Sequence, residues 1–317
     1  MIMAYRRAVL GVAAALPLAR PGIAQGFPAR PIQLIVPFAP GGGTDISARH
    51  YANAAARLGV PMQVVPMAGA GGARGSRTAA EAAPDGYTLL FGTMGSTITA
   101  ALLHSVGYQP DSFDPIAIVG TPSFIFAVGG QSAIRSVADL VAAARRTQIS
   151  YGSAGAGSST NLVVELFARR IGAEFLHIPF NGSAEALTAM LGGHVELTVP
   201  TTGSTLPPMR SGHVRGIAIT AEARSAEAPD LPTLRESGVD LVFYNWRGIL
   251  APRGLPREVA ASLTDLSRRI VAEPEFARQF THAEGEPPVF RDSAAFARQI
   301  AEETEAQRDI VAALRRR

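Results

Sequence analysis

Cysteine and lysine are both missing from the 317 residues of the chain. Without cysteine the protein has no thiol nucleophile, no zinc–thiolate site, no disulfide and no lipidated N-terminal cysteine. Without lysine it has no P-loop lysine and no lysine that could form a Schiff base or act as a general base. All 29 cationic side chains are arginines. These absences remove several classes of enzyme and leave arginine as the source of positive charge.

Long apolar runs are also scarce. Beyond the first 24 residues, no run reaches the roughly 18–20 apolar residues that a membrane-spanning helix needs. The overall hydrophobic content is nevertheless 47%. A chain of 317 residues exceeds the usual size of a single core. We therefore expect two well-packed domains and no membrane span in the mature protein.

The first 24 residues are typical of a cleavable secretory signal. The sequence MIMAYRR is a basic leader, AVLGVAAALPLA is a short apolar core, and Gly22-Ile23-Ala24 provides small residues before a cleavage site. Arg6-Arg7 matches a twin-arginine signal only loosely, so the route of export, Sec or twin-arginine, stays open. We predict an exported, soluble, non-lipidated protein whose mature chain begins near Gln25.

Removal of this signal changes the charge balance. Residues 1–24 contain three arginines and no acids, which leaves 26 arginines against 26 acidic residues in the mature chain. A formal net charge of zero means that the mature chain has no excess of positive charge to attract nucleic acid or an acidic membrane surface. We therefore expect neither as a partner.

Strand and helix patterns alternate along the chain and predict the α/β class. Residues 32–38 are almost continuously apolar, as in a strand that is covered on both faces of a parallel sheet, and a helical pattern follows. The same order recurs after residue 137, so we predict two doubly wound α/β domains. The predicted strands are 32–38, 62–65, 87–93, 149–153, 173–180, 195–200 and 214–220, and the predicted helices are 44–58, 76–83, 137–146, 161–170 and 184–191.

Two extended segments, near residues 120–128 and 243–250, are predicted to join the domains. Lobe I would then comprise residues 25–124 and 247–317, and lobe II residues 125–246. Helical patterns that start at Pro256 and after Ser293 have no strands of their own, so we expect them to pack on lobe I. Trp246, the one tryptophan of the sequence, lies in the second crossing. It either packs at the hinge or stacks on a ligand.

Turns rich in glycine and hydroxyl groups stand where strands give way to helices. They are PFAPGGGTD at 37–45, GTMGST at 92–97 and GSAGAGSST at 152–160. A helix start has about four unpaired N–H groups and roughly half a positive charge, so a carboxylate or phosphate can bind there without a basic side chain. The alternative is structural, with tight turns and helix caps alone. Three such turns at strand ends favour an anion site between two lobes.

Enzyme signatures are incomplete in this sequence. In GAGGARG, Arg74 stands where a dinucleotide fingerprint needs its third glycine, and Thr160 takes that place after Gly155 and Gly157. No G-x-S-x-G elbow occurs. The six histidines show no metal-ligand spacing, and we expect His50 and His177 to be structural. The sequence thus predicts no catalytic residue, no metal and no cofactor, and an exported hydrolase is the least favoured alternative.

Six stretches of the chain resemble the substrate-binding proteins of tripartite tricarboxylate transporters, also called Bug receptors. They are FPARPIQLIVPFAPGGGTDISAR, GAGGARG, APDGYTLLFGTMGS, ISYGSAGAGSSTNLVVELF, HIPFNGSAEALTAMLGGHVEL and WRGILAPRGLP. The resemblance implies a type II-like, flytrap periplasmic binding protein without catalytic activity. Such a receptor holds a small organic carboxylate between its lobes and delivers it to a membrane permease with a large and a small subunit. Presentation of the ligand to a two-component sensor kinase is the alternative output.

The resemblance also assigns ligand contacts to four loops. Residues 38–45 and 93–97 in lobe I would hold one carboxylate, partly through water, while residues 153–161 and 180–183 in lobe II would face the rest of the ligand. The expected ligand-binding residues are Phe38, Ala39, Gly42, Gly43, Thr44, Asp45, Thr93, Met94, Ser96 and Thr97 in lobe I, and Ser153, Gly155, Ala156, Gly157, Ser158, Ser159, Thr160, Asn161, Phe180, Asn181, Gly182, Ser183, Pro200 and Thr201 in lobe II.

Some positions depart from the family's pattern near the expected cleft. Phe180-Asn181 stands where the family often has tyrosine followed by a cation, and Pro200 stands where it often has aspartate. A phenol, a cation and an acid are therefore missing. These departures leave open which carboxylate binds and what holds its distal group.

Overall fold

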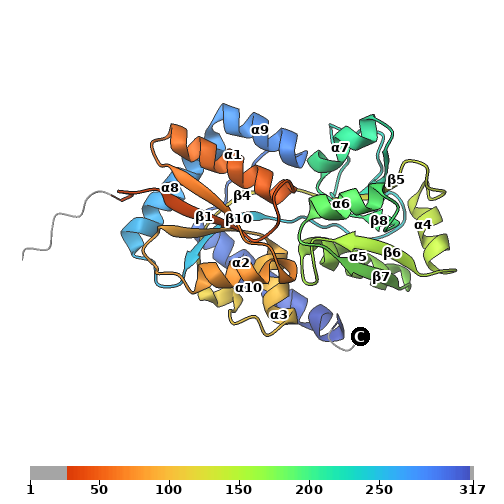
Figure 1. The fold of residues 1–317 in the computed structure, drawn as a ribbon, viewed down its shortest axis with the longest axis horizontal. Helices are drawn as coiled ribbons and strands as arrows, with labels where there is room; N and C mark the ends of the chain where they lie inside the picture. The colour runs from red at the N-terminus through yellow and green to blue at the C-terminus, as the bar shows by residue number, and fades with distance from the viewer. Residues whose placement is uncertain (1–26, 315–317) are drawn as a thin grey trace, which may run out of the picture.

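The computed structural model describes residues 27–314 and shows two five-stranded sheets that lie side by side, each covered by helices (Figure 1). We use lobe I for the half around the sheet with strand order β2-β1-β3-β10-β4, and lobe II for the half around β7-β6-β8-β5-β9. The predicted signal peptide, residues 1–24, lies outside the described residues. The α/β class and the two lobes predicted from the sequence are confirmed.

The sheet of lobe I is mixed. Strand β1 (Ile32–Val36) pairs in parallel with β2 (Met62–Pro66) and β3 (Thr88–Gly92). Strand β10 (Arg247–Pro252) then lies antiparallel between β3 and β4 (Phe113–Gly120). Helices α1, α8 and α9 cover one face and α2, α3 and α10 the other (Figure 1). Their bounds are α1 Gly43–Arg57, α2 Ala73–Ala80, α3 Ala100–Leu103, α8 Arg257–Ala272, α9 Pro274–Glu284 and α10 Ser293–Leu314, with short helical turns at Ala70–Gly72, Gly95–Thr99 and Pro110–Ser112.

Lobe II repeats this plan with other strands. Strand β6 (Ile149–Ser153) pairs in parallel with β7 (Phe175–Pro179) and β8 (Leu197–Thr198). Strand β5 (Ile125–Gly129) is antiparallel to β8 and to β9 (Val214–Ile219). The helices are α4 Val137–Ala144, α5 Ser159–Ile171, α6 Ser183–Leu191 and α7 Thr202–Arg210. Each lobe is therefore a parallel βα layer with antiparallel strands added.

The chain passes between the lobes twice, as predicted. Residues 121–124 lead from β4 to β5, and residues 220–246 lead from β9 back to β10. Apolar packing is continuous through both crossings, because Phe124 stacks on Phe243 at 5.9 Å between ring centroids. Trp246 is 1% exposed, packs edge-on against Phe296 at 4.8 Å and donates its indole N–H to Glu303. Of the two alternatives for Trp246, the structure shows packing.

Several features of the chain differ from the predicted elements, among them the short helix α3 (Ala100–Leu103), which was not predicted. Helix α7 was not predicted, because Pro207 and Pro208 in its sequence are typical helix breakers. Helix α9 was not predicted either, although Pro274 occupies the favoured first turn. The strand predicted at 195–200 is reduced to Leu197–Thr198. The terminal helices pack on lobe I as expected, since α8 and α10 contact β4 and α9 contacts α1.

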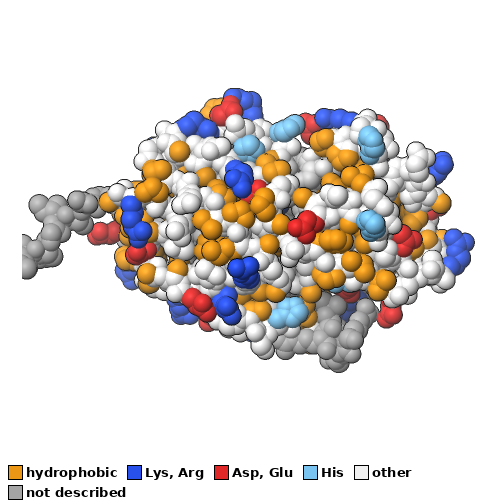
Figure 2. Space-filling model, viewed as in Figure 1, with side chains coloured by type: hydrophobic (Ala, Val, Ile, Leu, Met, Phe, Trp, Pro, Cys, Tyr) orange, Lys and Arg blue, Asp and Glu red, His pale blue; other side chains and the backbone are white. Residues whose placement is uncertain are grey.

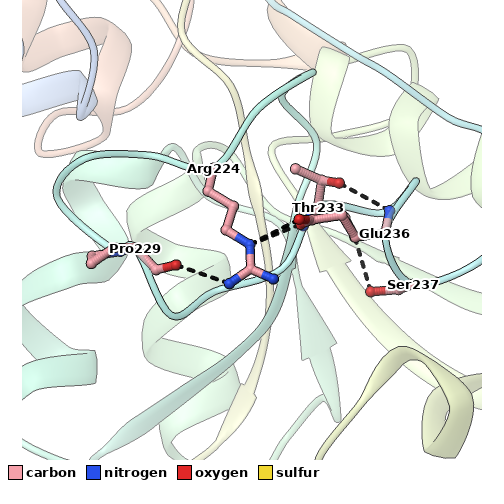
Figure 3. Close-up of polar contacts among 5 residues, drawn as sticks. All are labelled: Arg224, Pro229, Thr233, Glu236 and Ser237. Atoms are coloured by element: carbon pink, nitrogen blue, oxygen red, sulfur yellow. Dashed lines mark hydrogen bonds and ion pairs between the residues drawn. The ribbon is translucent and has the colours of Figure 1, made fainter.

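The long second crossing is ordered by polar contacts (Figure 3). Thr233 and Glu236 cap one another, since each backbone N–H donates to the other's side chain at 2.8 and 3.0 Å. Arg224 donates to Glu236 and to the carbonyl of Pro229. The Thr233 N–H and the Arg224 guanidinium hold the pKa of Glu236 below its usual value. These contacts fix residues 224–237 without a helix or strand.

The surface carries arginines and acids in an interspersed arrangement on the face shown in Figure 2. This distribution agrees with the balanced charge expected for the mature chain. Within residues 27–314, no helix combines the length and the apolar composition that crossing a bilayer would require.

Candidate functional site

A small cavity lies where the two lobes meet. Its volume is about 30 Å³, which is room for about two water molecules or one compact polar group. Both lobes and both crossings contribute to its wall. The lining residues are Phe38, Gly42, Thr44, Asp45 and Thr93 from lobe I, Ala154, Ser158, Ser159, Thr160, Ser183 and Thr201 from lobe II, and Phe124, Asn245 and Arg247 from the ends of the crossings.

The lobe II wall is the turn that starts α5. Ser158 is the N-cap of this helix, and its hydroxyl accepts the N–H of Asn161. The Thr160 hydroxyl accepts the N–H of Ala154 at 2.9 Å, and the Asn161 side chain accepts the N–H of Gly157 at 3.0 Å. Gly157 has a φ of +81°, in the left-handed region that glycine adopts without strain. The turn is therefore held in shape by its own side chains.

The lobe I wall is the turn that starts α1. Gly42 is the N-cap and supplies no side-chain cap, so no capping side chain engages the first N–H groups of the helix. The Asp45 carboxylate accepts the N–H of Gly41 at 3.0 Å and forms a two-point ion pair with Arg49 at 3.0 Å. The negative charge that faces the cavity is therefore already neutralised.

The third predicted turn, after β3, is held by hydrogen bonds between its own residues. The Thr93 N–H donates to the Ser96 hydroxyl at 3.1 Å, and the Ser96 N–H donates to the Thr93 hydroxyl at 3.2 Å. A π-helical turn, Gly95–Thr99, begins there. Thr93 lines the cavity, whereas Met94, Ser96 and Thr97 do not.

Several backbone contacts hold the lobes together around the cavity. The Gly95 N–H of lobe I donates to the Ser159 hydroxyl of lobe II at 2.8 Å. The Ala39 N–H donates to the Asn181 carbonyl at 3.0 Å. Gly71 lies so close to the Ala156 carbonyl that a Cβ could not fit between them. The structure is therefore a closed arrangement, in which Ala39, Ala156 and Asn181 join the lobes instead of lining the cavity.

The structure brings ten of the predicted site residues to the cavity and places the others around it. The ten are Phe38, Gly42, Thr44, Asp45, Thr93, Ser158, Ser159, Thr160, Ser183 and Thr201. The remaining fourteen, which belong to the same turns without lining the cavity, are Ala39, Gly43, Met94, Ser96, Thr97, Ser153, Gly155, Ala156, Gly157, Asn161, Phe180, Asn181, Gly182 and Pro200.

Sequence reasoning missed four residues of the wall: Phe124, Ala154, Asn245 and Arg247. Phe124 and Asn245 belong to the crossings, and Arg247 is the first residue of β10. One signal was present, because an asparagine and an arginine stand inside the otherwise apolar stretch FYNWRGILAP. Such polar side chains in a buried extended segment need partners, which a site between lobes provides.

Arg247 forms a buried ion pair with Glu284 at the end of α9. Its Nε and Nη2 donate to the carboxylate at 2.7 and 3.0 Å, and both side chains are at most 1% exposed. The Ser47 hydroxyl donates to the same carboxylate at 2.6 Å. Burial of two charges costs several kcal/mol each in desolvation, so these three bonds are needed to retain the pair.

Two other titratable groups lie near the site. Burial lowers the pKa of His177 to about 4, and its ring stacks on Tyr151 and hydrogen-bonds the Ser153 hydroxyl at 2.6 Å. At the first crossing, Ser123 donates to Glu286, and burial raises the pKa of that carboxyl to about 7. Within the described part of the chain, no group of three His, Asp or Glu could hold a metal ion.

Comparison with known proteins identifies relatives over most of the chain. Residues 47–315 match the profile of a family described as "Tripartite tricarboxylate transporter family receptor". Protein BugT of Bordetella pertussis is 35% identical over 271 residues, which is 83% of each chain. The structure of MatC from Rhodopseudomonas palustris with bound malate has a TM-score of 0.84 and 30% identity, and covers 90% of this chain and 100% of MatC. R. palustris Rpa4515 with adipate also has a TM-score of 0.84, with 29% identity, and covers 90% of this chain and 97% of that one.

Proposed function

The chain belongs to the family of tripartite tricarboxylate transporter receptors, and on that premise we propose that it binds one small organic carboxylate between its lobes in the periplasm and delivers it to a membrane permease. The family and its structural relatives are substrate-binding proteins and not enzymes. The ligand class, the compartment and the permease partner, with its large and small subunits, are the parts that we propose.

One observation carries the proposal: the N-termini of two long helices from opposite lobes, α1 and α5, converge on one cavity. In this closed arrangement the cavity has room for about two waters, so a carboxylate ligand requires the lobes to stand further apart than they do here. Each helix start contributes N–H donors and roughly half a positive charge. A hydrogen bond to an ionised ligand contributes about 1.5–3 kcal/mol. Four or five of them, less desolvation and ordering costs, are enough for a micromolar site at about −8 kcal/mol. The malate and adipate in the two related structures support the same ligand class.

Closure follows from the placement of the donors. A ligand between α1 and α5 touches both helices only when the lobes are together, so it binds the closed state more tightly and shifts the population toward that state. Delivery to the permease then depends on recognition of the closed form.

Export and domain limits complete the proposal. We propose that residues 1–24 are removed as a signal peptide and that the mature protein is soluble and non-lipidated. Lobe I comprises residues 25–124 and 247–317, and lobe II comprises residues 125–246. These limits place each crossing at the boundary between the two sheets.

A thermal-shift screen tests the ligand class. The panel is malate, succinate, citrate, adipate, benzoate and their neutral amides. A ligand at 100 times its dissociation constant adds about 2.7 kcal/mol of apparent stability, which raises the midpoint measurably. We expect shifts with one or more acids and none with the amides. Shifts from neutral amides alone would contradict the proposal, as would the absence of any compaction by small-angle X-ray scattering with a bound acid.

A further inference from the structure

The position of Arg247 places a cation at the ligand edge of lobe I. In the pairing of β10 with β3, Gly248 lies opposite Gly92, so Arg247 stands where β3 ends and the Thr93 turn begins. Because β1 and β3 are parallel, the turn that starts α1 lies at the same edge. Among the described residues that line the cavity, Arg247 is the one cation and Asp45 the one acid.

Within the described residues, only part of the Arg247 guanidinium forms hydrogen bonds. Glu284 takes the edge formed by Nε and Nη2. The group has five N–H donors, so the edge that contains Nη1 is left over. Nη1 has no hydrogen-bond partner among residues 27–314, although Arg247 is 1% exposed. A buried charged donor without a partner is unfavourable, and a carboxylate matches the remaining edge of a guanidinium.

The surroundings of Arg247 favour an anion as that partner. Asp45 is neutralised by Arg49 and by the Gly41 N–H, so it does not compete for Arg247. The Phe180-Asn181 turn supplies no cation from lobe II. A ligand with one carboxylate at the helix N-termini therefore finds, in the cavity wall, the unpartnered Nη1 edge of Arg247 as a donor for a second one, although Glu284 already offsets the net charge of the guanidinium.

We infer that Arg247 determines ligand specificity: the Nη1 edge of its guanidinium, held in place by Glu284, binds the second carboxylate of a dicarboxylate ligand. This inference rests on the proposed function, because it assigns a contact within the same site. A dicarboxylate is therefore preferred to its monoamide, which offers Arg247 a neutral group.

The test compares each diacid with its monoamide. Wild-type protein and variants are titrated by calorimetry with malate, succinate, adipate and the monoamide of each. The main variant is the double substitution Arg247→Gln with Glu284→Gln, which removes both charges together and leaves neither buried alone. The matched control is Arg57→Gln, which removes a two-point arginine pair with Glu273 on the surface of lobe I.

We expect the wild type and the Arg57→Gln control to bind one of the diacids about 10- to 100-fold more tightly than its monoamide, the range of one charged hydrogen bond. In the double variant that ratio falls to about one, through loss of affinity for the diacid. A ratio that persists in the folded double variant overturns the role of Arg247. If no acid binds to the wild type, the proposed function itself is wrong.

A second variant keeps the inference testable if the double variant does not fold. Arg247→Lys keeps the buried charge pair with Glu284 but has no second guanidinium edge, so the ratio of diacid to monoamide affinity should fall toward one. A ratio equal to that of the wild type in this variant contradicts the contact between the Nη1 edge and the ligand.

Discussion

Ser159 joins the two lobes through one hydroxyl: it accepts the Gly95 N–H of lobe I and donates to the Asn245 side chain of the second crossing, both at 2.8 Å. The first bond joins the two lobes, and the second ties the serine to the crossing. The closed state therefore depends in part on a single serine at the start of α5, which also lines the cavity.

Ser159→Ala should weaken ligand binding about two- to tenfold, because the closed state loses one neutral hydrogen bond between the lobes, worth about 0.5–1.5 kcal/mol. Calorimetric titration with the bound acid measures the change. Ser237→Ala, which removes a hydroxyl bond to the Thr233 carbonyl (Figure 3), is the control and should leave the affinity unchanged, because neither residue lines the cavity. Equal affinities in Ser159→Ala and wild type would contradict this role.

Gly95→Ala should prevent the lobes from closing while each lobe still folds. A Cβ at this position would overlap the backbone nitrogen of Ser159, and this overlap exists only when the lobes are together. We expect the affinity to fall at least about tenfold and the ligand-dependent compaction in small-angle scattering to disappear. Gly129→Ala places a Cβ in open space on lobe II and should do neither. Normal compaction of Gly95→Ala would show that the lobes approach differently.

Glu286 should make the protein less stable as the pH rises from about 4.5 to 7. Burial raises its folded-state pKa to about 7, so the folded protein holds a proton that the unfolded chain releases over this range. The stabilisation is complete below the unfolded pKa and is lost as the pH passes through the folded one. In Glu286→Gln this component of the pH dependence should be absent, as measured by urea unfolding at several pH values. An unchanged profile would contradict the raised pKa.

His177 should make the protein less stable as the pH falls, which is the opposite of the effect of Glu286. Burial lowers its folded-state pKa to about 4, so the unfolded chain takes up a proton between about 6.5 and 4 that the folded protein does not. Its contribution to stability is therefore lost as the pH falls through that window. His177→Gln, which can still hydrogen-bond Ser153, should reduce the loss, whereas the exposed His213→Gln should not. Nuclear magnetic resonance titration of the His177 ring gives the pKa directly.

The sequence was sufficient for those parts of the site that a single turn defines. The GSAGAGSST stretch predicts a helix start after β6, and Ser158 does cap α5. Residues that reach the site from segments distant in the sequence were not predictable in this way. Arg247 faces the cavity because β10, which follows β3 by more than a hundred residues, enters between β3 and β4 in the antiparallel direction. Glu284 reaches Arg247 from the end of α9, a helix that the sequence pattern did not reveal.

The second crossing also contains an intrinsic fluorophore, the tryptophan Trp246. Trp246 is the sole indole of the chain and stands between Asn245 and Arg247, both of which form the cavity wall. Its N–H is bonded to Glu303 and its ring rests against Phe296, both on α10. Any shift of the crossing when the lobes open changes the polarity around this one ring. The intrinsic fluorescence of the unlabelled protein should therefore report both the occupancy of the site and the rate of closure.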